Sequence, residues 1–318
     1  MGKAADCIGF TAGSPWFEFP RSLPAFLFAP LNYRHHYHAG NYADVFKHAL
    51  LVPLVRAMQR KDKGFLYLDT HAGRGGYDLA TGAYLADGRE RAPEWPAGIG
   101  RFWSGEAGPL KDYLDLVREF DRERGGGGEG PGHYPGSPWL ACRLLRPQDR
   151  AALCELRAEE AEALDLLVGA ARNVKVQAMD GYTALRALLP PPEKRALVLI
   201  DPPFESQTEF ADIGRGLAEA LRRFPSGVYA VWYPVTERAR VDRFMEGLAA
   251  LRPPPTLTVE LQIAGDSSQI RMKGCGLLVI NPPWRIEPEL RAGLPLLGER
   301  LAQDAGAGTR LTWLVPEA

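Results

Sequence analysis

Short runs of mostly apolar residues recur along this chain, the clearest being the unbroken run at 196–200, and most of them stop at an acidic residue or a breaker. A run of this length is typical of a strand that is buried on both faces of a parallel sheet. The pattern predicts seven strands, at residues 65–68, 152–156, 174–179, 196–200, 227–234, 256–263 and 276–280. The last two are expected to form a closing hairpin.

Between these runs, apolar residues recur three and four positions apart, which is the period of one face of an α-helix. The spacing predicts helices at about 41–60, 139–145, 159–171, 183–189, 210–224 and 241–251. Strands that alternate with helices predict an α/β fold with a doubly wound, mostly parallel, seven-stranded Rossmann-like sheet. Ligands of such sheets bind at the carboxyl ends of the strands.

The alternation is interrupted twice. Residues 1–30 mix prolines, small residues and aromatics without any period, and we expect a poorly ordered leader there. Residues 77–134 interleave arginines with aromatics and contain a flexible glycine run at 125–130, so we expect an inserted, mainly helical subdomain. One domain would then comprise residues 31–76 and 135–318. The inserted subdomain could serve as a scaffold or could grip RNA.

The strand at 196–200 runs directly into Asp201, Pro202, Pro203 and Phe204. Proline has no N–H and a fixed φ, and it pushes the preceding residue into an extended conformation. The result is a stiff corner at the carboxyl end of a strand, which holds a carboxylate, the Pro202 carbonyl and an aromatic ring in a fixed relation. The plainer alternative is that these residues only end a strand and turn the chain.

This corner suits the exocyclic amine of adenine. The amine donates two N–H groups, and its lone pair is delocalised into the ring, so it is a poor nucleophile. Two fixed acceptors can take the N–H bonds and draw the lone pair out of conjugation, while an aromatic face stacks on a base that has been flipped out. Asp201, Pro202 and Phe204 are therefore the candidate catalytic residues.

A glycine-bearing turn follows the first strand, with Asp69, Gly73 and Gly75 in the pattern Asp-x-x-x-Gly-x-Gly. This is neither the dinucleotide fingerprint nor a Walker loop. An acid before the glycines favours S-adenosylmethionine (SAM) over dinucleotides. The acid near the end of the second strand, Glu155, is placed to hold ribose hydroxyls, and Asp180 could accept a hydrogen bond from the cofactor's adenine.

The predicted helix at 41–60 has Asn41 or Asp44 as a plausible cap and carries a polar patch of Asp44, Lys47 and His48. Two interpretations of this patch remain open. It could be a solvated basic face, or it could contact phosphate or cofactor. Three of the six histidines lie just before this helix, but no spacing of metal ligands supports a metal site.

A second proline corner, Asn281-Pro-Pro-Trp284, follows the last predicted strand. An Asn-Pro-Pro-aromatic tetrad can also serve amino methylation, so there are two candidates. The catalytic corner should follow the central fourth strand, next to the strand of the glycine turn. We therefore assign catalysis to Asp201 and expect Asn281 at the far side of the sheet.

Composition limits the partners. The 318 residues suffice for a large core, and a net charge of −1 means that any nucleic-acid contact must come from a local basic patch. The four cysteines lack metal spacing, no run approaches the ~18 apolar residues that span a bilayer, and no secretory signal is evident. We expect a cytoplasmic monomer without metal or membrane attachment.

Taken together, the motifs of this chain resemble the bacterial 23S ribosomal RNA adenine-N6 methyltransferase J family. The resemblance runs from about residue 31 to the C-terminus, and Phe204 stands where the family usually has tyrosine. It is carried by Tyr33-Arg-His-x-x-His-Ala-Gly-Asn-x-Ala-Asp-Val-x-Lys-His48, Phe65-Leu-Tyr-Leu-Asp-Thr-His-Ala-Gly73, Tyr134-Pro-Gly-Ser-Pro138, Leu199-Ile-Asp-Pro-Pro203, Trp232-Tyr-Pro234 and Ile280-Asn-Pro-Pro-Trp284.

The resemblance implies a class I SAM-dependent methyltransferase fold with a helical insertion, acting on 23S rRNA. It implies cofactor contacts at His48, His71, Ser137, Glu155, Asp180, Gly181 and Asp201, to which the glycine turn adds Gly73. Asp201 would accept the proton, and Tyr33 would meet the target nucleotide. Lys47, beside these residues, is expected to steer phosphate.

Two other functions are compatible with these motifs. An Asp-Pro-Pro-Phe corner does not distinguish RNA from DNA, so a DNA adenine methyltransferase is one alternative. No target-recognition domain and no large basic surface are evident in its favour. The second alternative is a non-catalytic RNA-binding module on a methyltransferase fold, which predicts an incomplete cofactor site.

Overall fold

The computed structural model describes residues 37–79, 83–84, 90–265 and 267–317. The predicted leader, residues 1–30, and the predicted substrate residue Tyr33 lie outside this part of the chain. The described residues belong to one compact unit.

The core of the fold is a single large sheet with the strand order β12-β10-β11-β9-β8-β1-β6-β7. Five adjacent strands, from β7 to β9, are parallel, and β11 and β12 run in the opposite direction. The strands are β1 (Leu66–Asp69), β6 (Arg150–Glu155), β7 (Val174–Ala178), β8 (Ala196–Ile200), β9 (Val228–Val235), β10 (Thr256–Gln262), β11 (Gly274–Ile280) and β12 (Gly308–Val315). The predicted fold class is confirmed.

The sheet has eight strands rather than the predicted seven, because β12 and the helix before it, α8 (Glu287–Leu301), were not predicted. β12 is an edge strand that pairs only with β10 in the sheet, and most of its residues are half-buried or exposed. It therefore lacks the continuous apolar run that identifies a central strand.

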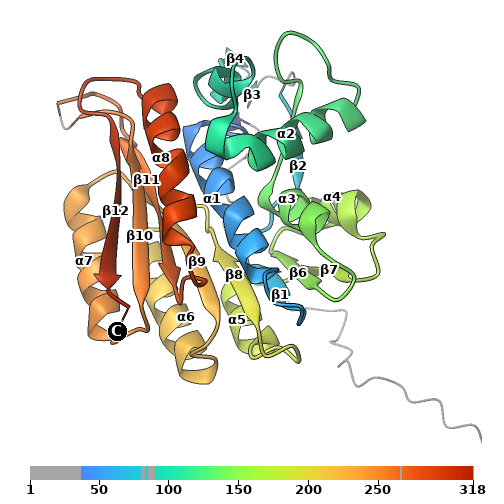
Figure 1. Ribbon diagram of the computed structural model, residues 1–318, viewed down its shortest axis with the longest axis vertical. Helices are drawn as coiled ribbons and strands as arrows, with labels where there is room; N and C mark the ends of the chain where they lie inside the picture. Colours follow the sequence, from blue (N-terminus) through green and yellow to red (C-terminus); the bar gives the residue numbers. More distant parts are fainter. Residues whose placement is uncertain (1–36, 80–82, 85–89, 266, 318) are drawn as a thin grey trace, which may run out of the picture. The chain divides into compact units, whose positions relative to one another are not determined.

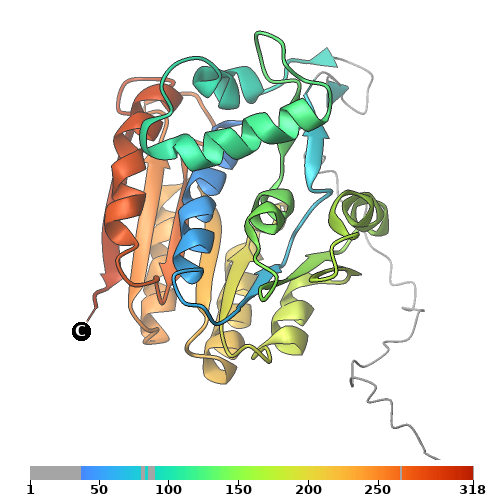
Figure 2. The same ribbon diagram turned by 45° about the vertical axis from the view of Figure 1, so that its right-hand side comes forward.

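Helices cover both faces of the sheet (Figures 1 and 2). Leu197 and Leu199 of β8 face a core that includes α1 (Tyr42–Met58), α3 (Ser137–Leu144) and α8. Val198 and Ile200, which point the other way, face a core with α5 (Gly181–Leu188), α6 (Glu209–Arg223) and α7 (Arg238–Ala250). The unbroken apolar run of β8 reflects this burial on both sides. The remaining helix of the sheet layers is α4 (Ala158–Val168).

The insertion contains the α-helix α2 (Lys111–Glu123), but it is less helical than the mainly helical subdomain that was expected. Short 3-10 turns occur at 95–97, 99–102 and 108–110, and four short strands are present: β2 (Gly76–Asp78), β3 (Ala83–Tyr84), β4 (Glu90–Arg91) and β5 (His133–Pro135). Tyr113, Val117 and Phe120 of α2 join the same core as α1. The insertion therefore packs on the α1 face of the fold, and its boundaries as a subdomain remain a prediction.

Because β1, β6, β7 and β8 are parallel neighbours, their carboxyl ends meet at one edge of the sheet, the upper edge in Figure 1. Among the helices described, none combines the length and apolar character that crossing a bilayer requires. Within the same part of the chain, no group of three or more His, Cys, Asp or Glu side chains is placed to bind a metal ion.

Candidate active site

Asp201 directly follows β8, and β8 pairs in parallel with β1, the strand that leads into the glycine turn. Pro202 is buried. Phe204 has a left-handed backbone (φ 51°), and its ring packs edge-on against Phe210 and Trp232, with centroids 5.1 and 5.6 Å away. The proline corner thus holds an acid and an aromatic ring at the end of a central strand, as predicted. Trp232 is a contribution from β9 that the strand pattern did not identify.

The Asp201 carboxylate is held from the other side by α1. The ammonium group of Lys47 donates to Oδ2 of Asp201 at 2.5 Å and to Oδ1 of Asp44 at 3.0 Å. The second oxygen of Asp44 accepts from the backbone N–H of Gly40 at 3.1 Å. A helix residue more than 150 positions before Asp201 therefore orients the candidate catalytic acid.

The burial of Lys47 decides between the interpretations of the α1 patch. Asp44, Lys47 and His48 are 3%, 6% and 1% exposed, so a solvated basic face is wrong. Burial alone would lower the pKa of Lys47, but the Asp201 and Asp44 carboxylates outweigh it and raise the pKa well above its usual value. A lysine that is charged, buried and held by two acids is poorly placed to steer phosphate from solvent, so the geometry instead favours orientation of Asp201.

Asp69, at the end of β1, lies at the centre of a buried hydrogen-bond cluster. Its Oδ2 accepts from the hydroxyls of Tyr67 at 2.9 Å and Ser137 at 2.8 Å, and its Oδ1 accepts from the backbone N–H of His71 at 3.4 Å. Burial raises the pKa of Asp69 to about 6, although the two hydroxyl donors act in the opposite direction. Ser137, a predicted cofactor residue, thus also orients this acid.

Glu155, at the end of β6, is fixed by backbone donors. Its Oε2 accepts from the N–H of Gly73 and its Oε1 from the N–H of Arg157, both at 2.9 Å. Burial raises the pKa of the Glu155 carboxyl, and these two backbone hydrogen bonds oppose that shift. Gly73 has φ +59°, which glycine adopts without strain, so the turn can bring its N–H onto the acid.

Asp180, which follows β7, caps α5 by accepting from the N–H of Thr183 at 2.7 Å. Gly181 then begins the helix against the loop after β1, because a Cβ there would lie 2.3 Å from the carbonyl oxygen of Thr70. On the same side, burial lowers the pKa of His71 to about 4, and Nδ1 of its ring lies 2.8 Å from Oγ1 of Thr70. His71, Asp180 and Gly181 therefore lie around one loop contact between β1 and α5.

His48, on α1, is buried to about the same extent as Asp69. Its Nδ1 lies 2.8 Å from the hydroxyl of Tyr134, which lies 2.9 Å from the hydroxyl of Tyr113 in the insertion. The His48 and Tyr134 rings are stacked at 5.6 Å. This packing ties α1 to the insertion, and a cofactor contact of His48 stays a prediction.

The second proline corner lies at the opposite edge of the sheet. β11 runs antiparallel to β9, so its carboxyl end, and with it Asn281, lies beside the start of β9. The Asn281 amide donates to the backbone oxygens of Pro225 at 2.5 Å and Gly227 at 2.9 Å. The expected separation of the two corners is correct, but its cause is strand direction, because β11 is an inner strand next to β9 rather than an edge strand.

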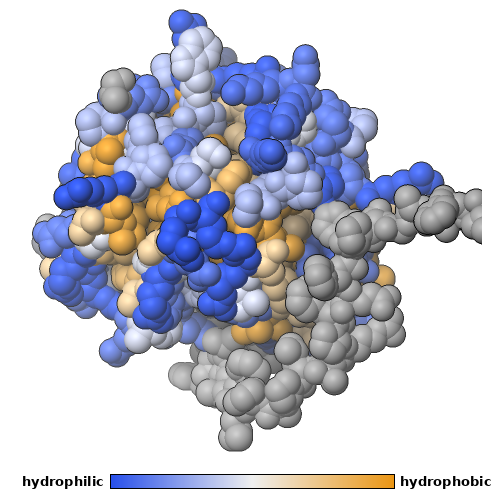
Figure 3. Space-filling view, turned by 90° about the horizontal axis from the view of Figure 1, so that it is seen from below, coloured by the Kyte–Doolittle hydropathy of each residue, from blue (hydrophilic) through white to orange (hydrophobic). Residues whose placement is uncertain are grey.

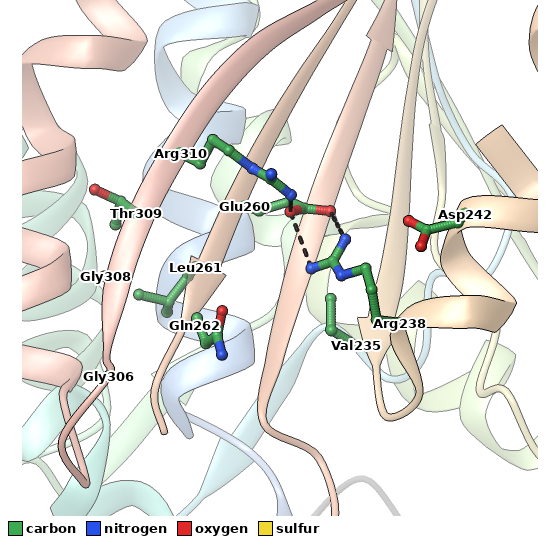
Figure 4. A pocket seen from close by; sticks show the side chains of 10 residues that line it. All are labelled: Val235, Arg238, Asp242, Glu260, Leu261, Gln262, Gly306, Gly308, Thr309 and Arg310. Carbon is green, nitrogen blue, oxygen red and sulfur yellow. Dashed lines mark hydrogen bonds and ion pairs between the residues drawn. The ribbon is translucent and has the colours of Figure 1, made fainter. Parts of the chain in front are cut away.

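A cavity of about 540 Å³ opens farther along the carboxyl edge, between the end of β10, the start of β12 and the start of α7 (Figure 4). Arg238 and Arg310 converge there on Glu260. Both arginines and the Tyr233 hydroxyl lower the pKa of Glu260 against the effect of burial. None of the predicted site residues lines this cavity. It is separate from the acids of β1, β6, β7 and β8.

The hydrogen-bond acceptors at the ends of β1, β6, β7 and β8 fit a cofactor that carries hydroxyl, amine and adenine N–H donors. Carboxylates accept from all three kinds of donor. Glu155 and Asp180 follow the two strands beyond β1, and Asp69 and Asp201 end the two central ones. The sheet and this row of acids define a class I methyltransferase of the SAM-dependent type.

Comparison with known proteins identifies the family. A model described as "Ribosomal RNA large subunit methyltransferase D, RlmJ" matches residues 62–315, and the chain belongs to this family. It is 39% identical over 289 residues to ribosomal RNA large subunit methyltransferase J of Escherichia coli K12, which covers 90% of this chain and 100% of that protein. The protein of the same name from Haemophilus influenzae is 37% identical with the same coverage.

A solved structure agrees with this assignment. Protein LPL1258 of Legionella pneumophila shares 34% identity, with a TM-score of 0.73 over 87% of this chain and 97% of that chain. The family expected from the sequence motifs is therefore confirmed, while the roles of the individual site residues stay predictions.

Proposed function

We propose that this protein transfers the methyl group of SAM to the N6 amine of an adenine in 23S rRNA. The observation that carries the proposal is the Asp201 carboxylate, which stands at the end of β8 beside the glycine turn of β1 and is held at 2.5 Å by Lys47. The names of the curated relatives, both large-subunit rRNA methyltransferases, support RNA rather than DNA as the substrate.

The residues of the chain would act by position and charge. Asp201 and the Pro202 carbonyl accept the two N–H groups of the amine, so its lone pair is free to attack, and Asp201 takes the proton. Phe204, braced by Phe210 and Trp232, offers a face on which the everted base can stack. When bound, SAM supplies an electrophilic methyl group. Most of the acceleration then comes from orientation and electrostatics.

Lys47 contributes by holding the Asp201 carboxylate in place. Its charge compensates two buried carboxylates, and an acid that is already oriented loses little freedom when the adenine arrives. The cofactor contacts are assigned to His48, His71, Gly73, Ser137, Glu155, Asp180 and Gly181. Tyr33 is assigned to the target nucleotide, and the protein is expected to act as a monomer in the cytoplasm.

The test replaces the acid and keeps its shape. Asp201→Asn retains a carbonyl acceptor but removes the proton acceptor, so kcat on protein-free 23S rRNA is expected to fall by about 10²–10⁴-fold. Titration calorimetry should show SAM binding within a few-fold of wild type. Transfer of labelled methyl groups to the rRNA transcript measures the rate.

The control is Glu162→Gln, the same change of acid to amide at an exposed position of α4. It should leave both kcat and SAM affinity unchanged. An Asp201→Asn enzyme that methylates rRNA at the wild-type rate would contradict the role of Asp201. A wild-type protein that methylates duplex DNA but not 23S rRNA would contradict the substrate, and one that does not bind SAM would support the binding-module alternative.

A further inference from the structure

The second proline corner ends in an exposed aromatic side chain that methyl transfer does not use. Trp284 is 70% exposed, and the guanidinium carbon of Arg285 lies 4.2 Å from the centroid of its ring. The backbone oxygen of Trp284 accepts from Arg60 of the loop after α1 at 2.6 Å. A tryptophan that is held in place but left open to solvent is a typical platform for stacking.

Further exposed cations lie along the same edge of the sheet, where the parallel strands begin. The loop after α1 lies at this edge too. The backbone oxygen of Lys61 accepts from Arg146 at 3.1 Å, and that of Lys63 accepts from Arg195, which directly precedes β8. We call the group, together with Trp284, the strand-start surface. Its exposed cations are Lys61, Lys63, Lys194, Arg252 and Arg285.

Figure 3 shows the face of the molecule that lies below in Figure 1, where hydrophilic side chains stand in groups around a band of apolar surface. In the described part of the chain, none of its five exposed cations forms an ion pair with an acid. Beneath them, burial and the neighbouring Arg146 lower the pKa of Arg195. Asp62 and Glu193 are the acids interspersed with these cations in the sequence, and they are fewer than the cations, so this edge carries a local excess of positive charge although the net charge of the protein is −1.

Three of these cations also have an unusual backbone. Lys194, Arg252 and Arg285 have φ values of 55°, 49° and 58°, in the left-handed region that glycine or asparagine adopts more easily. A long basic side chain at such a position does not stabilise the turn. Without an ion pair to an acid, it does not stabilise the fold either. Strained positions of this kind are enriched where a side chain has a function.

We propose that the strand-start surface is a second contact site for the rRNA substrate, in which its cations hold backbone phosphates and Trp284 stacks on an unpaired base. The exposed cations favour a polyanion as the ligand. Trp284, with Arg285 against its ring, favours RNA over an acidic protein, because unpaired bases can stack on it. The inference rests on the proposed rRNA substrate. It adds a contact at the edge of the sheet opposite the catalytic acid.

The position of the surface gives it a defined role. Strands of four to eight residues separate the two edges of the sheet, so the second site lies on the order of 20 Å from Asp201. A large folded rRNA can reach both edges at once. The contact therefore contributes affinity for the rRNA and leaves the methyl-transfer step itself unchanged.

The first test uses the strained positions. Lys194→Gly/Arg285→Gly removes two cations and relieves two left-handed residues, so the melting temperature should equal or exceed that of wild type. Filter binding to a protein-free 23S rRNA transcript should show a Kd at least about fivefold higher and a salt slope of log K that is smaller by about 1.5. Because filter binding needs no methyl transfer, this result is independent of the catalytic assignment.

The control is Arg215→Gln/Arg243→Gln, which removes two exposed cations from α6 and α7. It should bind the transcript like wild type. Trp284→Ala should weaken binding, and Trp284→Phe, which keeps an aromatic face, should restore most of it. A Lys194→Gly/Arg285→Gly protein with wild-type Kd and salt slope would overturn the proposal, as would equal binding by Trp284→Ala and Trp284→Phe.

Discussion

At the scale of single residues, the site is built from buried charges that compensate one another. Lys47 is shared by Asp44 and Asp201, so the three form one unit with a single net negative charge. Breaking a buried pair leaves an uncompensated charge, which costs far more than losing an exposed one. Asp69 differs, because it has hydroxyl and amide donors but no cation within hydrogen-bond reach in the described structure.

The raised pKa of Asp69 predicts a pH-dependent effect on stability. Because the pKa rises from 3.8 to about 6 on folding, ionising this acid costs the folded protein about 3 kcal/mol. The stability associated with protonated Asp69 is therefore fully present below pH 3.8 and is lost as the pH rises through 6. Asp69→Asn does not titrate, so its stability relative to wild type should increase by about 3 kcal/mol between pH 4 and 7.

Urea unfolding across this pH range measures the effect. The exposed control Glu162→Gln should follow the wild-type curve at a constant offset. If the Asp69→Asn and wild-type curves were also parallel, the burial of an ionisable Asp69 at the end of β1 would be wrong.

At the scale of elements, the cofactor side of the site depends on how closely α5 approaches the loop after β1. Gly181 makes the approach possible, since a Cβ there would meet the Thr70 carbonyl oxygen at 2.3 Å. Gly214, in α6, has no atom within 4 Å of such a Cβ. The two helical glycines therefore offer a matched pair, one that packs against backbone and one that does not.

Gly181→Ala is expected to destabilise the protein by about 1–3 kcal/mol, because the helix must move away from β1. SAM binding should weaken as Asp180 and His71 separate. Gly214→Ala should instead stabilise the protein by up to about 1 kcal/mol through helix propensity, with SAM binding unchanged. Urea unfolding and titration calorimetry give both quantities. Equal effects of the two substitutions would contradict the close α5–β1 contact.

At the scale of the whole molecule, strand direction assigns different roles to two similar motifs. β8 ends at the carboxyl edge of the parallel set and β11 at the opposite edge, so Asp201 and Asn281 face different surroundings. Asn281 donates to two backbone oxygens and adopts φ 52°, a conformation that asparagine tolerates. It acts as a structural link between the end of β11 and the start of β9.

Asn281→Ala should therefore lower the free energy of unfolding by about 2–3 kcal/mol, through lost hydrogen bonds and a strained backbone. Its kcat at saturating rRNA should stay within about twofold of wild type, in contrast to the fall for Asp201→Asn. Urea unfolding and methyl-transfer assays measure the two effects. A large loss of kcat with unchanged stability would show that the assignment of the two corners is reversed.

The sequence alone determined the features that depend on local chemistry. Apolar runs buried on both faces identified β1, β6, β8 and β9, because a parallel strand between two helix layers leaves few polar positions, whereas the edge strand β7 carries Lys175 and Gln177. The proline corner at Asp201 and the acids at the strand ends could be predicted for the same reason. The family motifs added residues that no periodicity marks, such as Ser137.

Only the tertiary structure decided which distant residues meet. The pairing of Lys47 with Asp201, the donors to Asp69 and the edge-on packing of Trp232 against Phe204 join elements far apart in the chain. A polar stripe on α1 looks the same in sequence whether water or a carboxylate lies opposite, and an edge strand such as β12 lacks a continuous apolar run. Burial and charge compensation depend on the partner, and packing alone supplies the partner.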